Sequence, residues 1–272
     1  MTKKLLFLDL DGTLLDDSKQ ITPGNRRALE GALQRGHGVV IATGRPLFSA
    51  IQTAASLGLD QPGCYVISFN GAVLYSFGDG RQLFRCSIAK EIVRRVFDKA
   101  KEWNLHIQTY DTREVLAEPW RNEEIVKNYC GIMGIPYRVV EDVCKALAED
   151  PPKMLAIEEK DFSKLDRLQK FLETELAGVV ECFHSNPSYL EIVKAGMNKG
   201  EAVRMLCRIL DIPIADAIAV GDAANDLSMI AAAGVGVAMA NGTEEVKAAA
   251  DYITKLDNNH DGVAEVVERF MN

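Results

Sequence analysis

Short apolar runs alternate with amphipathic segments at both ends of the chain. The runs at 5–8, 39–42 and 64–67 are continuous, which is typical of strands buried on both faces. Apolar residues recur at helical spacing after the first run, in a segment that opens with Thr22 and Pro23. This alternation predicts a parallel sheet with right-handed crossovers. It returns near the C-terminus, with expected helices at 199–210, 227–233 and 243–250 and strands at 218–220 and 236–238.

The middle of the chain has a different pattern. Pairs of period-two segments are separated by amphipathic stretches, which predicts a largely antiparallel sheet covered on one face. The fold class is therefore α/β, with a Rossmann-like core at 1–84 and 190–272 and an inserted α+β cap domain at 85–189. In the middle we expect strands at 105–110, 114–117, 137–140, 154–157, 179–183 and 190–193, and helices at 87–103, 122–133, 142–148 and 162–176.

Composition limits the classes of partner. The 272 residues are 47% hydrophobic and 26% charged, as in a globular protein, and the net charge is −8. Because nucleic acid and anionic membranes attract basic surfaces, we expect neither as a partner. The six cysteines form no C-x-x-C pair and are expected to be reduced thiols. Asp9 ends the first apolar run too early for a signal peptide, and we expect a cytoplasmic protein without a membrane span.

Polar clusters follow the predicted core strands directly. They are Asp9-Leu10-Asp11-Gly12-Thr13, Thr43-Gly44-Arg45, Asn70-Gly71 and the segment 221–226, while Lys199 opens a helix after the run at 190–193. Because ligands bind at the carboxyl ends of strands in open parallel sheets, we expect these groups to form one site. Each cluster alone also fits a simpler role, since Asn-Gly is a common hairpin turn and Thr43 is able to cap a helix.

The clusters resemble, in order, the four motifs of the haloacid dehalogenase-like hydrolase superfamily. The matching residues are Asp9-Leu10-Asp11-Gly12-Thr13, Thr43-Gly44-Arg45, Lys199-Gly200 and Gly221-Asp222-x-x-Asn225-Asp226. Ser68-Phe69-Asn70-Gly71-Ala72, Leu190-Glu191-Ile192 and Asp261-Gly262-Val263 are similar to the Cof-type sugar-phosphatase branch. The resemblance covers nearly the whole chain. It implies hydrolysis of small phosphomonoesters, with sugar phosphates among them.

The resemblance implies a role for each carboxylate. Asp9 is expected to be the nucleophile that forms an aspartyl-phosphate, and Asp11 the general acid and base. Because several carboxylates would repel a phosphate, a hard divalent cation is needed, and we expect Mg²⁺. The implied ligands are Asp9, Asp222 and the backbone carbonyl of Asp11, with Asp226 behind them or on a metal-bound water.

The remaining site residues are expected to hold the substrate. The phosphate oxygens would be bound by the Leu10 amide, the Thr43 hydroxyl, the Gly44 amide, the Lys199 ammonium and the Asn225 side chain. Asn70, Gly71 and Glu191 are candidate substrate contacts, and an ion pair on its strand is an equal alternative for Glu191. Arg45 is expected in an ion pair or a helix cap rather than on the substrate.

Two other functions remain open from the sequence. A phosphomutase would use the same groups and would release no inorganic phosphate. A receiver-like phospho-acceptor module also uses an acidic pocket with Mg²⁺, Thr and Lys, but the pair of Asp9 and Asp11 and the inserted domain argue against it. The sequence identifies neither the phosphorylated metabolite nor the choice between monomer and homodimer.

Overall fold

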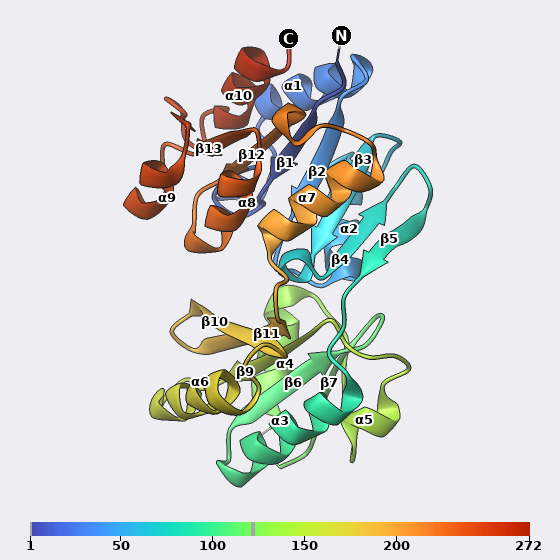
Figure 1. Ribbon diagram of the computed structural model, residues 1–272, viewed down its shortest axis with the longest axis vertical. Helices are drawn as coiled ribbons and strands as arrows, with labels where there is room; N and C mark the ends of the chain where they lie inside the picture. The colour runs from blue at the N-terminus through green and yellow to red at the C-terminus, as the bar shows by residue number, and fades with distance from the viewer. Residues whose placement is uncertain (1, 121–122) are drawn as a thin grey trace. The chain divides into compact units, whose positions relative to one another are not determined.

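The computed structural model describes residues 2–120 and 123–272. Contacts divide the chain into two compact units, drawn in Figure 1. The first unit runs to Phe84 and resumes at Asn198, and the second comprises Arg85–Met197. The core was expected to resume at 190, so the second boundary lies further along the chain than the sequence predicted.

The first unit contains an eight-stranded sheet. Its central strands are parallel, with Leu5 of β1 in register with Ala217 of β12 on one side and Gly38 of β2 on the other. The β3–β4 pair is antiparallel, so Asn70-Gly71 does lie in a hairpin turn. The strand order is β14(Tyr252–Ile253), β13(Val235–Ala238), β12(Ala217–Gly221), β1(Leu5–Leu8), β2(Gly38–Ala42), β3(Cys64–Ser68), β4(Val73–Ser76) and β5(Arg81–Arg85).

Helices cover both faces of this sheet because its strands are apolar on both sides. Leu6 and Leu8 pack into a core with α1, α2 and α10, whereas Leu5 and Phe7 pack into a second core with α7 and α8. The helices of this unit are α1(Pro23–Gln34), α2(Leu47–Ser56), α7(Lys199–Ile209), α8(Leu227–Ala232), α9(Glu244–Ala249) and α10(Gly262–Phe270). This two-faced arrangement confirms the predicted α/β fold class.

The second unit contains a six-stranded sheet and four described helices. Among the described residues, its strand pairings are antiparallel except that of β7 with β8. The expected helix start at Asn122 lies outside the described residues. The strand order is β10(Val180–Asn186), β11(Tyr189–Lys194), β9(Lys153–Ile157), β6(His106–Tyr110), β7(Val115–Ala117) and β8(Tyr137–Val139), and the helices are α3(Lys90–Glu102), α4(Glu124–Met133), α5(Val143–Ala146) and α6(Ser163–Glu175).

Strand β11 explains the shifted boundary. Glu191 pairs with Leu155 of β9 on one side and with Phe183 of β10 on the other, so this strand belongs to the inserted sheet. Its apolar residues Leu190 and Ile192 pack in the core of the second unit. The chain therefore returns to the first unit only where Asn198 caps α7.

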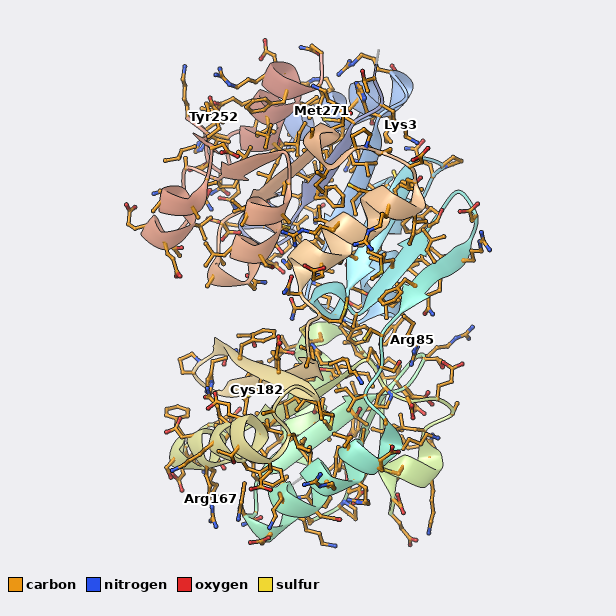
Figure 2. The ribbon with its side chains drawn as sticks, in the orientation of Figure 1. Lys3, Arg85, Arg167, Cys182, Tyr252 and Met271 are labelled. Atoms are coloured by element: carbon orange, nitrogen blue, oxygen red, sulfur yellow. The ribbon has the colours of Figure 1, made fainter. Side chains whose placement is uncertain are left out.

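The six cysteines are free thiols in this structure, including Cys182 on β10 (Figure 2). Burial raises the pKa of Cys64 to about 11, so this thiol is poorly reactive at neutral pH. Within the described part of the chain, no helix has the length and apolar character needed to cross a membrane.

Asp261 joins the two ends of the first unit. Its carboxylate accepts hydrogen bonds from the Thr22 hydroxyl and the Asn25 amide at the start of α1, and the Asn25 side chain accepts from Ala264 of α10. The hydrogen bond from Thr22 is the main reason that the pKa of Asp261 lies below its usual value. Because Asp261 has a φ of +64°, asparagine is a suitable substitution, since it keeps the size of the side chain and also tolerates a left-handed backbone.

We expect Asp261→Asn to lower the free energy of unfolding by about 1 kcal/mol at neutral pH, since a charge-assisted acceptor is lost. The folded-state pKa of Asp261 lies below the unfolded value of about 3.9, so the stabilisation is present above that value and disappears as pH falls through the folded pKa. Urea unfolding across the acid range measures this. Asp211→Asn is the matched control, because Asp211 is also left-handed (φ +52°) but exposed. An equal effect in both variants would contradict the role of Asp261.

Candidate active site

The structure brings the predicted polar clusters to one edge of the first unit's sheet. Strands β12, β1, β2 and β3 are neighbours and parallel, so their carboxyl ends lie side by side. Asp9 follows β1, Thr43 follows β2 and Asp222 follows β12. Residues that are far apart in the sequence therefore meet at one sheet edge.

A buried lysine lies at the centre of this edge. Lys199 Nζ is 2.6 Å from Asp9 Oδ1 and 2.7 Å from Asp226 Oδ1. Only 1% of Lys199 is exposed, although it is the first residue of α7. Burial lowers the pKa of Lys199, but the two carboxylates outweigh this effect and leave the pKa above its ordinary value. Lys199 is therefore a fixed positive charge between two acids.

Both carboxylate oxygens of Asp226 accept hydrogen bonds. Besides the contact of Oδ1 with Lys199, Oδ2 accepts hydrogen bonds from the amides of Asp222 and Ala223 at 3.0 and 3.1 Å. Asp226 is fully buried, and a Cβ on Gly221 would lie 2.4 Å from its side chain. These contacts fit the expected supporting position of Asp226 behind the reacting groups.

Asp222 is oriented by the cluster that follows β1. Thr13 Oγ1 donates to Asp222 Oδ1 at 2.9 Å. Gly12 has a φ of +85°, and a Cβ there would lie 2.5 Å from Asp222 Oδ2. The Asp-Gly-Thr sequence is thus needed for the approach of Asp222 to the end of β1.

The electrostatics of the cluster favour a cation. Burial raises the pKa of Asp9 to about 7 against the opposing effect of Lys199, and burial raises the pKa of Asp222 to about 6. Asp9, Asp222 and Asp226 each offer an oxygen within 4.8 Å of the others, so this cluster is able to hold a metal ion. Three carboxylates share a single ammonium, and a divalent ion with oxygen ligands fits the remaining negative charge.

Asp11 has a different environment from Asp9. Its side chain is 47% exposed and contacts Arg45 Nη2 at 2.9 Å and Lys19 Nζ at 2.7 Å. Partial burial raises the pKa of Asp11, but hydrogen bonds from Lys19 and Arg45 outweigh it and leave the pKa below its usual value. The expected ion pair of Arg45 is confirmed. Lys19 was not among the candidate residues, because no sequence motif marks this turn residue as a partner of Asp11.

The candidate phosphate-binding residues lie around the same edge. Leu10 and Thr43 are buried, Gly44 is partly buried and Asn225 is exposed in a short 3₁₀ turn over Ala224–Asp226. Thr43 Oγ1 accepts a hydrogen bond from the Arg45 amide at 3.2 Å. With Lys199, these groups place amide, hydroxyl and ammonium donors at the sheet edge that carries Asp9.

The three candidate substrate contacts have different surroundings. Glu191 lies in the second unit, where Lys153 Nζ approaches its Oε2 at 2.7 Å and Ser185 donates to Oε1. The structure thus contains the ion pair that was expected as the alternative to a substrate contact by Glu191. Asn70 is 7% exposed, and Gly71 packs so closely on Asn198 that a Cβ would lie 2.3 Å from its carbonyl oxygen.

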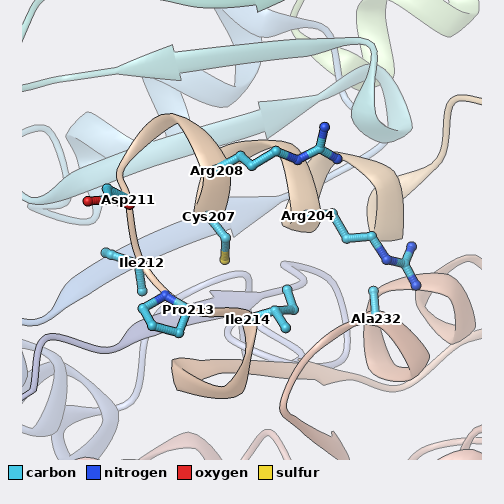
Figure 3. Close-up of a pocket in the computed structure, with 8 residues that line it drawn as sticks. All are labelled: Arg204, Cys207, Arg208, Asp211, Ile212, Pro213, Ile214 and Ala232. Carbon is cyan, nitrogen blue, oxygen red and sulfur yellow. The ribbon is translucent and has the colours of Figure 1, made fainter.

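A cavity of about 490 Å³ lies elsewhere in the first unit, at the C-terminal end of α7 (Figure 3). Its lining includes none of the motif residues. Arg204 at its rim is ion-paired with Glu201, and the C-terminal end of a helix disfavours anions. The cavity is lined by Arg204, Cys207, Arg208, Asp211, Ile212, Pro213, Ile214 and Ala232.

A doubly covered, largely parallel sheet with an acidic, lysine-bearing site at its strand ends defines an α/β enzyme core. Residues 6–267 match the sequence profile of the haloacid dehalogenase-like hydrolases. The chain belongs to this family of hydrolases.

Comparisons with individual proteins agree with this assignment. The chain is 30% identical to the 5-amino-6-(5-phospho-D-ribitylamino)uracil phosphatase YitU of Bacillus subtilis, over 98% of this chain and 97% of that protein. It is 29% identical to the pyridoxal phosphate phosphatase YbhA of Escherichia coli, over 98% of both chains. A crystal structure of a haloacid dehalogenase-like hydrolase from Bacteroides thetaiotaomicron has a TM-score of 0.89 and 34% identity, over 98% of this chain and 99% of that one.

We expect Lys199→Met to lower the free energy of unfolding by about 3–5 kcal/mol near neutral pH, because two buried carboxylates lose their cation. The loss should be smaller in mild acid. Lys199 lowers the pKa of Asp9, so its removal raises the folded-state pKa of Asp9 further above the wild-type value of about 7. The loss therefore decreases as pH falls through the range between these two folded-state values, and it stays constant once Asp9 is protonated in both proteins.

Urea unfolding of the metal-free protein across this pH range measures the effect. Lys3→Met is the control, because Lys3 is exposed in the same unit. A loss that does not depend on pH would show that packing, rather than charge, is the contribution of Lys199.

Proposed function

We propose that this protein is an Mg²⁺-dependent phosphatase that hydrolyses small phosphomonoesters, with sugar phosphates as the substrate class, through an aspartyl-phosphate on Asp9. The observation that carries the proposal is the buried contact of Lys199 with Asp9 and Asp226, beside Asp222. This arrangement provides a nucleophile, a fixed positive charge and an acidic metal site at one sheet edge.

Asp9 is the proposed nucleophile. Its amide donates to the Val220 carbonyl and its carbonyl accepts from Leu14, so the backbone that carries it is held on both sides. A carboxylate oxygen attacks the phosphorus atom, and the bond from phosphorus to the leaving oxygen breaks. Water then attacks the phosphorus of the aspartyl-phosphate, which releases inorganic phosphate and regenerates the carboxylate.

Asp11 is the proposed general acid and base. It gives a proton to the leaving oxygen in the first step and removes one from the attacking water in the second. The two ion pairs keep Asp11 ionised and without a proton to give, so Asp11 has to leave Arg45 or Lys19 and take up a proton before it acts as the acid. Its half-exposed side chain has the freedom for this movement.

The donors around Asp9 are proposed to hold the phosphoryl oxygens. They are Lys199, Asn225, the Thr43 hydroxyl and the amides of Leu10 and Gly44. Bound Mg²⁺, with Asp9, Asp222 and the Asp11 carbonyl as ligands, would neutralise part of the phosphoryl charge. Asp226 keeps Lys199 and the 222–223 amides in place while this charge develops.

The substrate is proposed to be a small phosphorylated metabolite in the cytoplasm. The two relatives named above are phosphatases of small organic phosphates, and the net charge of −8 disfavours nucleic acid. A panel of phosphomonoesters, assayed for released phosphate, tests the function and ranks the substrates. Transfer of the phosphoryl group within a sugar without phosphate release would indicate a phosphomutase instead.

Metal removal should abolish activity. A chelator such as EDTA is expected to stop phosphate release, and Mg²⁺ in excess should restore it, because the carboxylates of the cluster otherwise repel the substrate. Phosphate release before and after readdition measures this. Asp222→Asn should weaken Mg²⁺ binding in calorimetry without unfolding the protein. Full turnover in excess chelator would rule out the proposed mechanism.

The two aspartates of the first motif should respond differently to substitution. Asp9→Asn is expected to remove both turnover and the covalent intermediate. Asp11→Asn should slow phosphoenzyme formation from alkyl phosphates by about 10²–10⁴-fold, because the alkoxide needs a proton. Aryl phosphates release a stable phenolate, so they should give a burst of phenol followed by slow turnover.

Rapid-quench kinetics with intact-mass analysis detects the burst and the adduct. Equal losses on alkyl and aryl esters, without an adduct, would assign Asp11 a structural role.

A further inference from the structure

The turn after β3 has an unusual backbone. Phe69, Asn70 and Gly71 have φ angles of +50°, +55° and +113°, so three consecutive residues are left-handed. This conformation is unfavourable for residues with a side chain, and above all for a bulky one such as Phe69. Such a turn persists only where its surroundings determine it, and strained turns of this kind concentrate at functional sites.

Backbone hydrogen bonds join this turn to the loop after β2. The Phe69 amide donates to the Arg45 carbonyl and the Asn70 amide donates to the Thr43 carbonyl, both at 3.1 Å. Thr43 and Gly44 are the proposed phosphate-binding residues of that loop. The left-handed turn therefore sets the path of the phosphate-binding backbone from the neighbouring strand.

The Asn70 side chain is pressed against the same loop. A Cβ on Gly44 would lie 3.0 Å from Asn70 Oδ1 and 3.1 Å from Nδ2, so the carboxamide lies flat against Gly44. Only 7% of Asn70 is exposed, and its Oδ1 accepts no hydrogen bond from the described residues. A buried acceptor without a donor does not stabilise the fold, which indicates that this position serves the site.

The other end of the turn contacts the start of α7. A Cβ on Gly71 would lie 2.3 Å from the carbonyl oxygen of Asn198. Asn198 caps α7, since its side chain accepts a hydrogen bond from the Glu201 amide at 3.0 Å, and Lys199 follows it directly. One turn thus contacts both the Thr43–Gly44 loop and the residue that begins the lysine helix.

We propose that Asn70 is a positioning residue, whose carboxamide holds Gly44 and Thr43 where they meet the phosphoryl oxygens. The inference rests on the proposed function, because it assigns a phosphoryl group to this loop. It differs from the expectation that Asn70 contacts the substrate, since the side chain is buried against Gly44. Gly71 complements it by allowing the turn to reach Asn198.

Asn70→Gly tests the proposal, because glycine keeps the left-handed backbone and removes the carboxamide. We expect the dissociation constant for inorganic phosphate, measured by calorimetry with Mg²⁺ in excess, to rise about 10-fold or more. The kcat/KM for phosphomonoesters should fall by about 10²-fold, as for a misplaced binding group. Mg²⁺ affinity should stay unchanged.

Asn104→Gly is the matched control. Asn104 is also left-handed (φ +49°) but exposed in the second unit. Asn104→Gly should leave phosphate binding and kcat/KM unchanged. The change in its melting temperature measures what an Asn-to-Gly substitution costs at a left-handed position, and we expect a similar change for Asn70→Gly. Asn70→Asp is the second variant. It preserves shape but adds a charge beside the loop, so it should bind phosphate more weakly than Asn70→Gly.

The outcomes separate the two proposals. Wild-type phosphate affinity in Asn70→Gly would overturn the role of Asn70, and so would a loss accompanied by equal losses in Mg²⁺ affinity and melting temperature. If the wild-type chain binds phosphate, loses this through Asn70→Gly and yet hydrolyses no phosphomonoester, the proposed function fails and the role of Asn70 stands.

Discussion

The contact of Lys199 with Asp9 and Asp226 is the interaction on which the site depends. An isolated buried carboxylate is costly, and two of them side by side are more so. Lys199 makes this pair stable by contacting both at hydrogen-bond distance with almost no exposure. Because the three residues come from the segment after β1, from α7 and from the segment after β12, their contact also joins distant parts of the first unit.

The parallel register of the sheet makes this contact possible. Leu8 of β1 is level with Val220 of β12 and Ile41 of β2, so the residues that follow these strands emerge at one height. Small residues then permit the close approach of the carboxylates, with Gly12 against Asp222 and Gly221 against Asp226. The chemistry of the site therefore depends on positions where a side chain would not fit.

Much of this arrangement could be predicted from local sequence. Continuous apolar runs identify β1, β2, β3 and β12, because strands buried on both faces need apolar residues at every position. The polar motifs that follow these strands locate the site, because the carboxyl ends of parallel strands lie at one edge of the sheet.

Other features could not be predicted. Strand β5 was missed because Arg81–Arg85 is mostly polar and has no buried face. The resumption of the core at 190 was wrong because the apolar run in β11 resembles a core strand, and only its pairing with β9 and β10 assigns it to the inserted sheet. The contact of Lys19 with Asp11 depends on a turn and leaves no sequence pattern.

Asp9 and Asp11 have opposite electrostatic environments in the folded chain. They are two residues apart, yet burial raises the pKa of Asp9 to about 7 while two cations hold the pKa of Asp11 below its usual range. A nucleophile needs to be ionised and a general acid needs to be protonated, so the proposed roles require both shifts to reverse. A cation beside Asp9 favours its ionised form, and a phosphoryl dianion that competes for Arg45 removes one of the charges that keep Asp11 ionised. Under the proposed function, bound metal and substrate would supply the charges that reverse both shifts, and the half-exposed side chain of Asp11 leaves room for its change of partners.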